Sequence, residues 1–65
     1  MNEKDIYTSA NLLIKQYDVE GALDHAYDRM RDLMSQQDVK GASVWLSISV
    51  AIRELGDQGA RATLH

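Results

Sequence analysis

The sequence predicts an all-α fold, a small three-helix bundle, for a chain of 65 residues. Apolar residues recur with the period of about 3.6 residues that marks an amphipathic helix, in successive segments of the chain. A side chain that can cap a helix stands before each of these segments. The chain has no proline and no tract rich in glycine and serine, so we expect one domain without an internal linker.

The first two helices are expected over residues 3–17 and 19–36, where an apolar stripe follows one face and polar residues the other. Asn2 and Asp18 precede the two ranges, and their side chains can accept hydrogen bonds from the free N–H groups of the first turn. The stripe residues are Ile6, Ala10, Leu13, Ile14 and Tyr17 in the first range, and Val19, Ala22, Leu23, Ala26, Met30, Leu33 and Met34 in the second.

The third segment, residues 39–55, fits two patterns. Apolar residues alternate between Val44 and Ile52, which is typical of a strand. The segment also has a helical stripe, which consists of Ala42, Trp45, Ile48, Ile52 and Leu55. The start of the second helix, Asp18-Val19-Glu20-Gly21-Ala22, is echoed 20 residues later by Asp38-Val39-Lys40-Gly41-Ala42. Asp38 can therefore cap a helix here as well.

A helix is the expected outcome for this segment, because a lone strand leaves its backbone groups without partners and no second strand pattern is present. The alternative is a strand that two chains of a dimer share. Gly56 is expected to stop the helix. The domain is therefore expected to span residues 1–56, and residues 57–65, which are poor in apolar side chains, are expected to form a frayed, flexible tail.

Length and composition point to association with another chain. A domain of this size buries only about 60% of the surface that its unfolded chain exposes. Natural domains this small often add disulfides, a metal or a partner subunit. Cysteine is absent, which excludes disulfides and cysteine-based metal sites, and the two histidines, His25 and His65, are far apart in the sequence. Association is then the remaining means of stabilisation.

The amino-terminal residues 1–5 are polar and lack the basic-then-apolar order of a signal peptide. No apolar run approaches the roughly 18–20 residues that a helix needs to cross a bilayer. We therefore expect a cytoplasmic protein without a membrane partner.

No catalytic, cofactor-binding or metal-binding constellation is recognisable. Nucleophilic catalysis needs a nucleophile that a base orients, and His25 is the only internal imidazole. We expect His25 at the edge of the polar face of the second helix, as a surface histidine beside Asp28 and Arg29. A general base, or a weak surface cation site with Asp24 and Asp28, is the alternative. Glycine-rich motifs that cradle phosphates are absent, so neither an enzyme nor a cofactor or metal is expected.

Negative charge is concentrated in residues 18–38, where six carboxylates and two arginines give a balance of −4, within a net charge of −3 for the chain. Four carboxylates recur at i+4 and form an acidic ridge along the second helix: Glu20, Asp24, Asp28 and Asp32. The ridge is either an ordinary solvated face or a surface that meets a basic partner. Direct nucleic-acid binding is disfavoured, because a recognition helix over 39–55 would carry only two cations, Lys40 and Arg53.

The helix over 39–55 has more apolar residues than one core-facing side can use. If Trp45 and Ile48 face the core, Leu46 and Val50 point elsewhere, one turn apart. A three-helix domain cannot cover every side of this helix with its own chain. We therefore expect Leu46 and Val50, with Arg53 beside them, to lie in an interface with a second copy or a protein partner. The alternative is a central third helix that the other two helices wrap.

These features predict a small non-enzymatic interaction or regulatory protein, which acts as a homodimer or docks on a larger partner. The alternative is an acidic inhibitor whose ridge mimics nucleic acid, as small phage-type proteins can do. A DNA-binding helix-turn-helix regulator is the third hypothesis.

Several short patterns of this sequence resemble those of a known family. They are Ala10-x-x-Leu13-Ile14, Ala22 and Ala26, Gly41, Trp45-x-x-Ile48 and Ala51-Ile52-x-Glu54-Leu55. Over roughly residues 8–55 the chain thus resembles a family of short, uncharacterised proteobacterial helical proteins. The resemblance supports a helix over 39–55 and carries over no activity, cofactor or catalytic residue.

Overall fold

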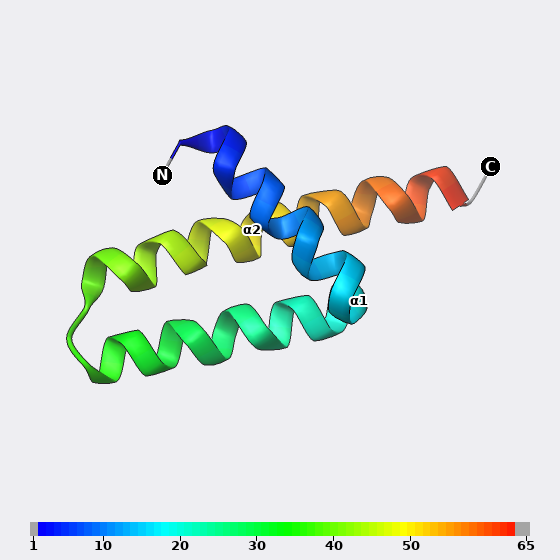
Figure 1. Cartoon of the computed structure of the whole chain (residues 1–65). Helices are drawn as coiled ribbons and strands as arrows, with labels where there is room; N and C mark the ends of the chain where they lie inside the picture. The colour runs from blue at the N-terminus through cyan, green and yellow to red at the C-terminus, as the bar shows by residue number, and fades with distance from the viewer. Residues whose placement is uncertain (1, 64–65) are drawn as a thin grey trace.

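The computed structural model describes residues 2–63, and side chains up to residue 58. It contains two α-helices, α1 (Glu3–Ser35) and α2 (Val39–Thr63), as Figure 1 shows. The all-α class is confirmed, but the three-helix bundle is wrong. The ranges expected as separate helices, 3–17 and 19–36, form one helix with a kink.

The kink lies at Asp18, whose backbone has φ 59° and ψ −175° inside α1. We call residues 3–17 the first arm and residues 19–35 the second arm. The Asp18 carboxylate accepts a hydrogen bond from the N–H of Gly21 at 2.9 Å, which confirms the expected cap. Because the chain turns within a single residue, no loop separates the arms, and the two amphipathic segments join in one element.

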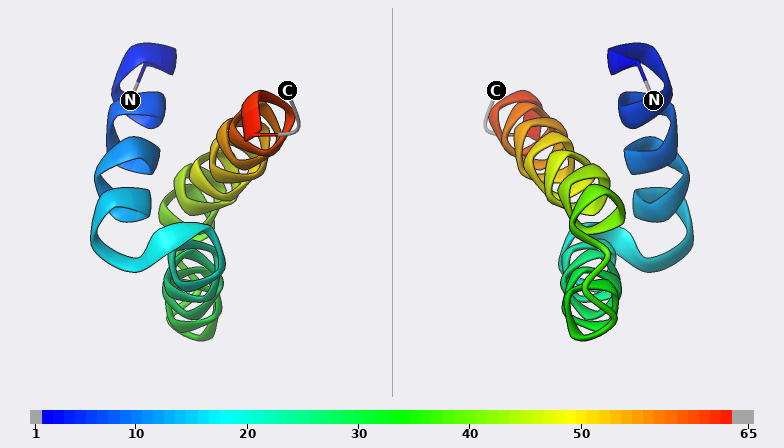
Figure 2. Two further views of the ribbon diagram at one scale, coloured as in Figure 1. Left: turned by 90° about the vertical axis from the view of Figure 1, so that its right-hand side faces the viewer. Right: turned by 90° about the vertical axis from the view of Figure 1, so that its left-hand side faces the viewer.

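The first arm crosses α2, whereas the second arm runs antiparallel beside it (Figure 1). Figure 2 shows the first arm on one side of the hairpin that the second arm and α2 form. The first arm begins with the expected cap, since Asn2 Oδ1 accepts a hydrogen bond from the N–H of Asp5 at 3.0 Å.

A tight turn joins α1 to α2. The N–H of Gln37 donates to the carbonyl of Met34 at 2.9 Å, and the N–H of Asp38 donates to that of Leu33 at 2.8 Å. This pair of hydrogen bonds is typical of a helix end at which one residue adopts the left-handed conformation. Gln37 is that residue, with φ 62°. Asp38 then caps α2 by accepting from the N–H of Gly41 at 3.0 Å. The Asp-x-x-Gly echo thus marks two capped helix starts.

Both glycines of the echo lie so close to neighbouring side chains that a larger residue would not fit unless those side chains shifted. A Cβ atom on Gly21 would lie 2.8 Å from Cβ of Tyr17, and one on Gly41 would lie 2.6 Å from Oδ2 of Asp38. At Gly41 the capping carboxylate itself therefore occupies the space of the missing side chain.

The segment that also fitted a strand is helical, since α2 covers all of residues 39–55. Its expected end at residue 55 and the frayed tail after it are wrong, because α2 continues through Gly56 to Thr63. Residues 64 and 65 lie outside the described residues. Gly56 serves close packing instead of stopping the helix. A Cβ atom there would lie 3.0 Å from Cγ1 of Val19, immediately after the kink.

The buried core consists mainly of alanine. Ala10, Ala22, Ala26, Ala42 and Ala51 are buried together with two larger side chains, Ile48 and Ile52. Most large apolar side chains pack around this core while remaining half-buried: Ile6, Tyr7, Leu13, Ile14, Val19, Leu23, Val44, Trp45 and Leu55. The Cα trace measures 44 × 22 × 15 Å, so the molecule is thin. Its core alone buries little large apolar surface.

The close approach at Gly56 is testable with a double-mutant cycle. Glycine to alanine inside a helix normally stabilises by about 1 kcal/mol. Here the added methyl group meets Val19, a β-branched side chain with little rotamer freedom. We expect Gly56→Ala to leave the free energy of unfolding unchanged or to lower it by about 1 kcal/mol. In a Val19→Ala background we expect the same change to stabilise by about 1 kcal/mol. Urea denaturation measures both, and equal stabilisation in the two backgrounds would contradict the contact.

The backbone strain at Asp18 is a second target. Residues other than glycine rarely adopt its φ and ψ, at a cost of about 1–3 kcal/mol. We expect Asp18→Gly to be at least as stable as the wild type, because relief of strain offsets the lost cap. Asp18→Ala loses the cap and retains the strain, and should lower the free energy of unfolding by about 1–2 kcal/mol.

Asp38 provides the matched control, because it caps a helix in the same way but has no positive φ. Asp38→Gly and Asp38→Ala should both lower the free energy of unfolding, which thermal or urea unfolding measures. A loss of stability for Asp18→Gly as large as that for Asp18→Ala would argue against strain at the kink.

Candidate functional site

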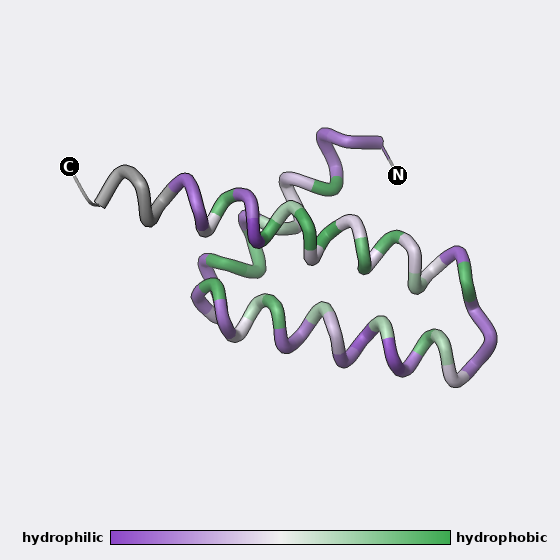
Figure 3. Tube along the Cα trace, turned by 180° about the vertical axis from the view of Figure 1, so that it is seen from behind, coloured by the Kyte–Doolittle hydropathy of each residue, from purple (hydrophilic) through white to green (hydrophobic). Residues whose placement is uncertain are grey.

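The outer side of α2 is apolar and exposed. Leu46 is 52% exposed and Val50 is 47% exposed, whereas Ile48 and Ile52 on the inner side are buried. The expected division of this helix into a core side and an outer side is therefore confirmed. Val39, which is 61% exposed, lies on the same outer stripe because seven residues, about two turns, separate it from Leu46. Figure 3 shows hydrophobic residues gathered along α2 in the view from behind.

Grooves extend this apolar stripe on both of its sides. A groove of about 310 Å³ lies between the stripe and the first arm, and Ile6 and Tyr7 line its far side. A groove of about 280 Å³ lies between the stripe and the end of the second arm, at Met30 and Met34. Leu46 lines both. We call the whole surface the apolar face, made up of Ile6, Met30, Met34, Val39, Leu46 and Val50.

A contact between distant parts of the chain fixes one edge of the apolar face. The hydroxyl of Tyr7 donates a hydrogen bond to the carboxylate of Glu54, and this bond ties the first arm to α2. The bond raises the pKa of Tyr7 above its ordinary value. Burial and the negative charges of Glu54 and Glu3 act in the same direction.

Arg53, expected beside Leu46 and Val50, is directed toward the second arm. Its guanidinium lies 5.7 Å from the centre of the Tyr27 ring and donates a hydrogen bond to the Tyr27 hydroxyl. Such a cation–π contact at an exposed site contributes about 0.5–1 kcal/mol. Arg53 thus contacts its own chain at the border of the apolar face.

His25 belongs to an aromatic cluster that the sequence did not predict. It is half-buried, stacks on Tyr17 with ring centres 5.4 Å apart, and meets the edge of Trp45 at 5.5 Å. The guanidinium of Arg29 lies 5.9 Å from the Trp45 ring centre. The expectation of a surface histidine beside a carboxylate is therefore wrong. The kink brings Tyr17 and His25 together, and helical spacing gives no sign of it.

A third apolar groove lies beside this cluster. The groove, of about 400 Å³, is lined by Leu12 and Leu13 of the first arm and by Val44, Trp45 and Ile48 of α2. Leu12 is 57% exposed, about as much as Leu46. The lining of this groove shares no residue with the apolar face, so Leu12 offers a matched control position for Leu46.

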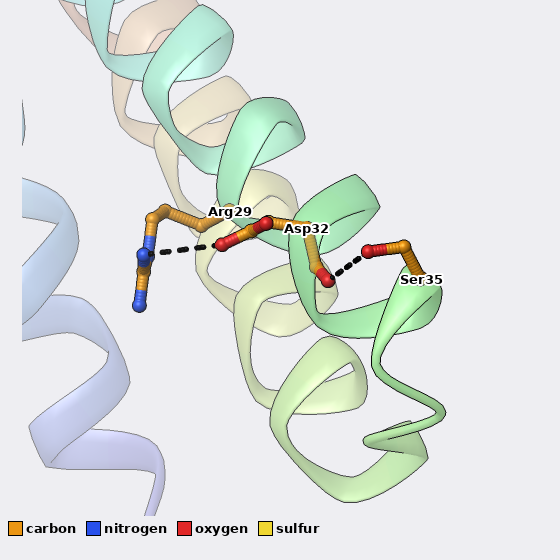
Figure 4. A network of polar contacts seen from close by, with 3 residues as sticks. All are labelled: Arg29, Asp32 and Ser35. Carbon is orange, nitrogen blue, oxygen red and sulfur yellow. Dashed lines mark hydrogen bonds and ion pairs between the residues drawn. The ribbon is translucent and has the colours of Figure 1, made fainter.

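The acidic ridge is exposed along its whole length, but arginines interrupt it. Asp28 pairs with Arg31, and Asp32 pairs with Arg29 at 3.7 Å. Figure 4 shows the latter pair, together with Ser35, whose hydroxyl donates to the carbonyl of Asp32 at 2.7 Å.

Ion pairs among the side chains up to residue 58 do not include the other two members of the ridge, Glu20 and Asp24. The four carboxylates therefore do not form one uniformly negative surface. Exposed pairs of this kind contribute about 0–1 kcal/mol each, so their effect is local charge neutralisation.

Within the described part of the chain, no group of three or more histidine, aspartate and glutamate side chains is arranged to hold a metal ion. Neither described helix has the combination of length and hydrophobicity that a bilayer-spanning helix needs. No protein-family model, curated protein or solved structure matches the chain. The resemblance of residues 8–55 to a helical proteobacterial family stays a prediction.

The contact between Tyr7 and Glu54 predicts a pH dependence. The folded pKa of Tyr7 is raised, so the contact stabilises the fold below the ordinary tyrosine pKa and is lost as the pH rises through the raised value. Glu54→Gln removes the negative charge and should lower the Tyr7 pKa. Tyrosine ring signals in an NMR titration measure this, with Tyr7→Phe to assign the signal. Asp57→Asn is the control, because Asp57 is exposed and does not contact Tyr7. An equal effect of the two amide variants would contradict the contact.

Proposed function

We propose that this chain is a small non-enzymatic interaction protein, which binds a second copy or another protein through the apolar face. The observation that carries the proposal is the exposure of Leu46 and Val50 on the outer side of α2, between two apolar grooves. Soluble monomers rarely leave a large contiguous apolar surface exposed unless something binds it.

The total exposed surface supports the same function. The chain exposes 4793 Å², whereas a compact monomer of 7.3 kDa exposes about 4,200 Å². The excess of about 600 Å² is a property of the whole elongated chain, and it is of the order of the roughly 800 Å² that one partner contributes to a standard protein interface. Apolar surface that remains in water lowers stability by about 25 cal/mol per Å² relative to burial. A partner on this face would recover part of that free energy.

The acidic-inhibitor alternative has weaker support, because arginines neutralise Asp28 and Asp32 locally. A DNA-binding regulator would need a basic recognition helix, and the outer stripe of α2 centres on Leu46 and Val50. A cytoplasmic location, as expected from the polar residues 1–5, belongs to the same proposal.

Capture from cells tests the proposed function. Three tagged forms are compared in a host that also expresses the untagged chain: the wild type, Leu46→Glu/Val50→Glu, and Leu12→Glu. Buried carboxylates are costly to desolvate, so the double variant should lose at least tenfold in affinity for a protein that binds the apolar face. Leu12→Glu introduces one carboxylate of the same kind at a similarly exposed site outside that face. It should therefore retain binding.

A captured protein, or the untagged chain itself, is then purified and titrated against the three forms by calorimetry. Binding through the apolar face should show a negative heat-capacity change. The proposal fails if every captured species, the untagged copy included, binds the double variant as tightly as the wild type.

A further inference from the structure

We infer that a second copy of this chain occupies the apolar face, with the two α2 helices packed antiparallel around a two-fold axis between Leu46 and Val50. This inference rests on the proposed function and names its partner. It depends on three properties of α2: the spacing of its outer residues, the order of their charges, and the surface that the chain leaves uncovered.

The outer residues of α2 have the spacing of a coiled-coil seam. Their intervals alternate between four and three residues, as in a heptad repeat. The stripe consists of Val39, Ser43, Leu46, Val50, Arg53 and Asp57. Its centre is apolar, and its carboxyl end is charged. Because α2 is continuous over this range, the stripe is straight enough to pack against an identical helix along about 27 Å, at about 1.5 Å per residue.

The order of charges along the stripe favours antiparallel pairing. In a parallel pair, Arg53 would face its own equivalent and so would Asp57, and like charges in contact repel. In an antiparallel pair centred between Leu46 and Val50, each Leu46 faces Val50 of the second copy. Arg53 then lies opposite Ser43, and Asp57 lies opposite Val39 with Lys40 beside it, so a carboxylate and a cation come near each other at both ends.

The acidic ridge does not oppose this arrangement. Asp28 projects from the second arm about half a turn away from Ala26, which is buried against the core. The ridge is therefore directed away from α2 and from a second copy packed on it. The net charge of −3 on each copy acts mainly at a distance, where salt screens it.

The chain as a whole exposes enough extra surface for a small stable dimer. If each copy buries its excess of about 600 Å², the pair buries about 1,200 Å², the lower end of the range for specific interfaces. A two-fold interface uses the same patch twice, so the patch must complement itself. The stripe meets this condition, because Leu46 and Val50 exchange places across the axis.

Multi-angle light scattering and sedimentation equilibrium between about 1 and 300 μM test the pairing. We expect the wild type and Leu12→Glu to have twice the chain mass at high concentration, and Leu46→Glu/Val50→Glu to have the mass of one chain. The melting temperature of the wild type should rise with concentration, because dimerisation stabilises by mass action. Circular dichroism shows whether the double variant remains helical. If the double variant loses its helicity, the concentration dependence of the wild-type mass decides, and a wild type with the mass of one chain contradicts the dimer.

A spin label on Val39→Cys tests the direction of pairing and leaves Leu46 and Val50 in place. Because Val39 lies at one end of the stripe, antiparallel helices separate the two labels by about 30 Å and parallel helices by about 10 Å. A pulsed electron paramagnetic resonance distance near 10 Å would overturn the antiparallel arrangement. A wild-type monomer at 300 μM would overturn the second copy as the occupant, and capture of a different protein would then leave the proposed function intact.

Discussion

Ala10, Ala22 and Ala26 of α1 are fully buried where α1 packs on α2, and their small side chains determine how closely the two helices approach. Methyl groups fill little volume, so the axes can lie near each other and the glycine at position 56 can pass beside Val19. The same closeness leaves little room inside for larger residues. Apart from Ile48 and Ile52, the large apolar side chains with described positions remain at least partly accessible to water. The exposed side of α2 follows from this thin core.

Local chemistry was the predictable part of the fold. Asn2, Asp18 and Asp38 each accept an N–H three residues ahead, and that preference depends on the capping side chain and the turn beside it. The number of helices was not predictable in the same way. A capping aspartate and two amphipathic stripes are compatible with a loop or with a one-residue kink, and the periodicity of the flanking segments is the same in both cases. The expectation that Gly56 stops the helix was wrong for a related reason, since Val19, against which Gly56 packs, is distant in sequence.

In the candidate site, too, local features could be predicted from the sequence and long-range contacts could not. Exposure of Leu46 and Val50 could be predicted, because it depends on the rotation of successive residues around one helix. The walls of the grooves could not, because they depend on where the first arm crosses α2. The bond from Tyr7 to Glu54 joins residues 47 apart in the chain, and no spacing rule reaches that far. The same applies to His25, which packs between Tyr17 and Trp45 only once both helices are in place.

The division of α2 into an alanine-lined side and an outer apolar side affects how such a chain can change during evolution. A larger residue at a buried alanine such as Ala22 or Ala51 would force the helices apart, so few substitutions are tolerated there. Leu46 and Val50 are about half exposed, so a change there disturbs the packing between the two helices less. Substitutions are therefore expected to be tolerated more readily on the outer side of α2 than on the side that packs against α1.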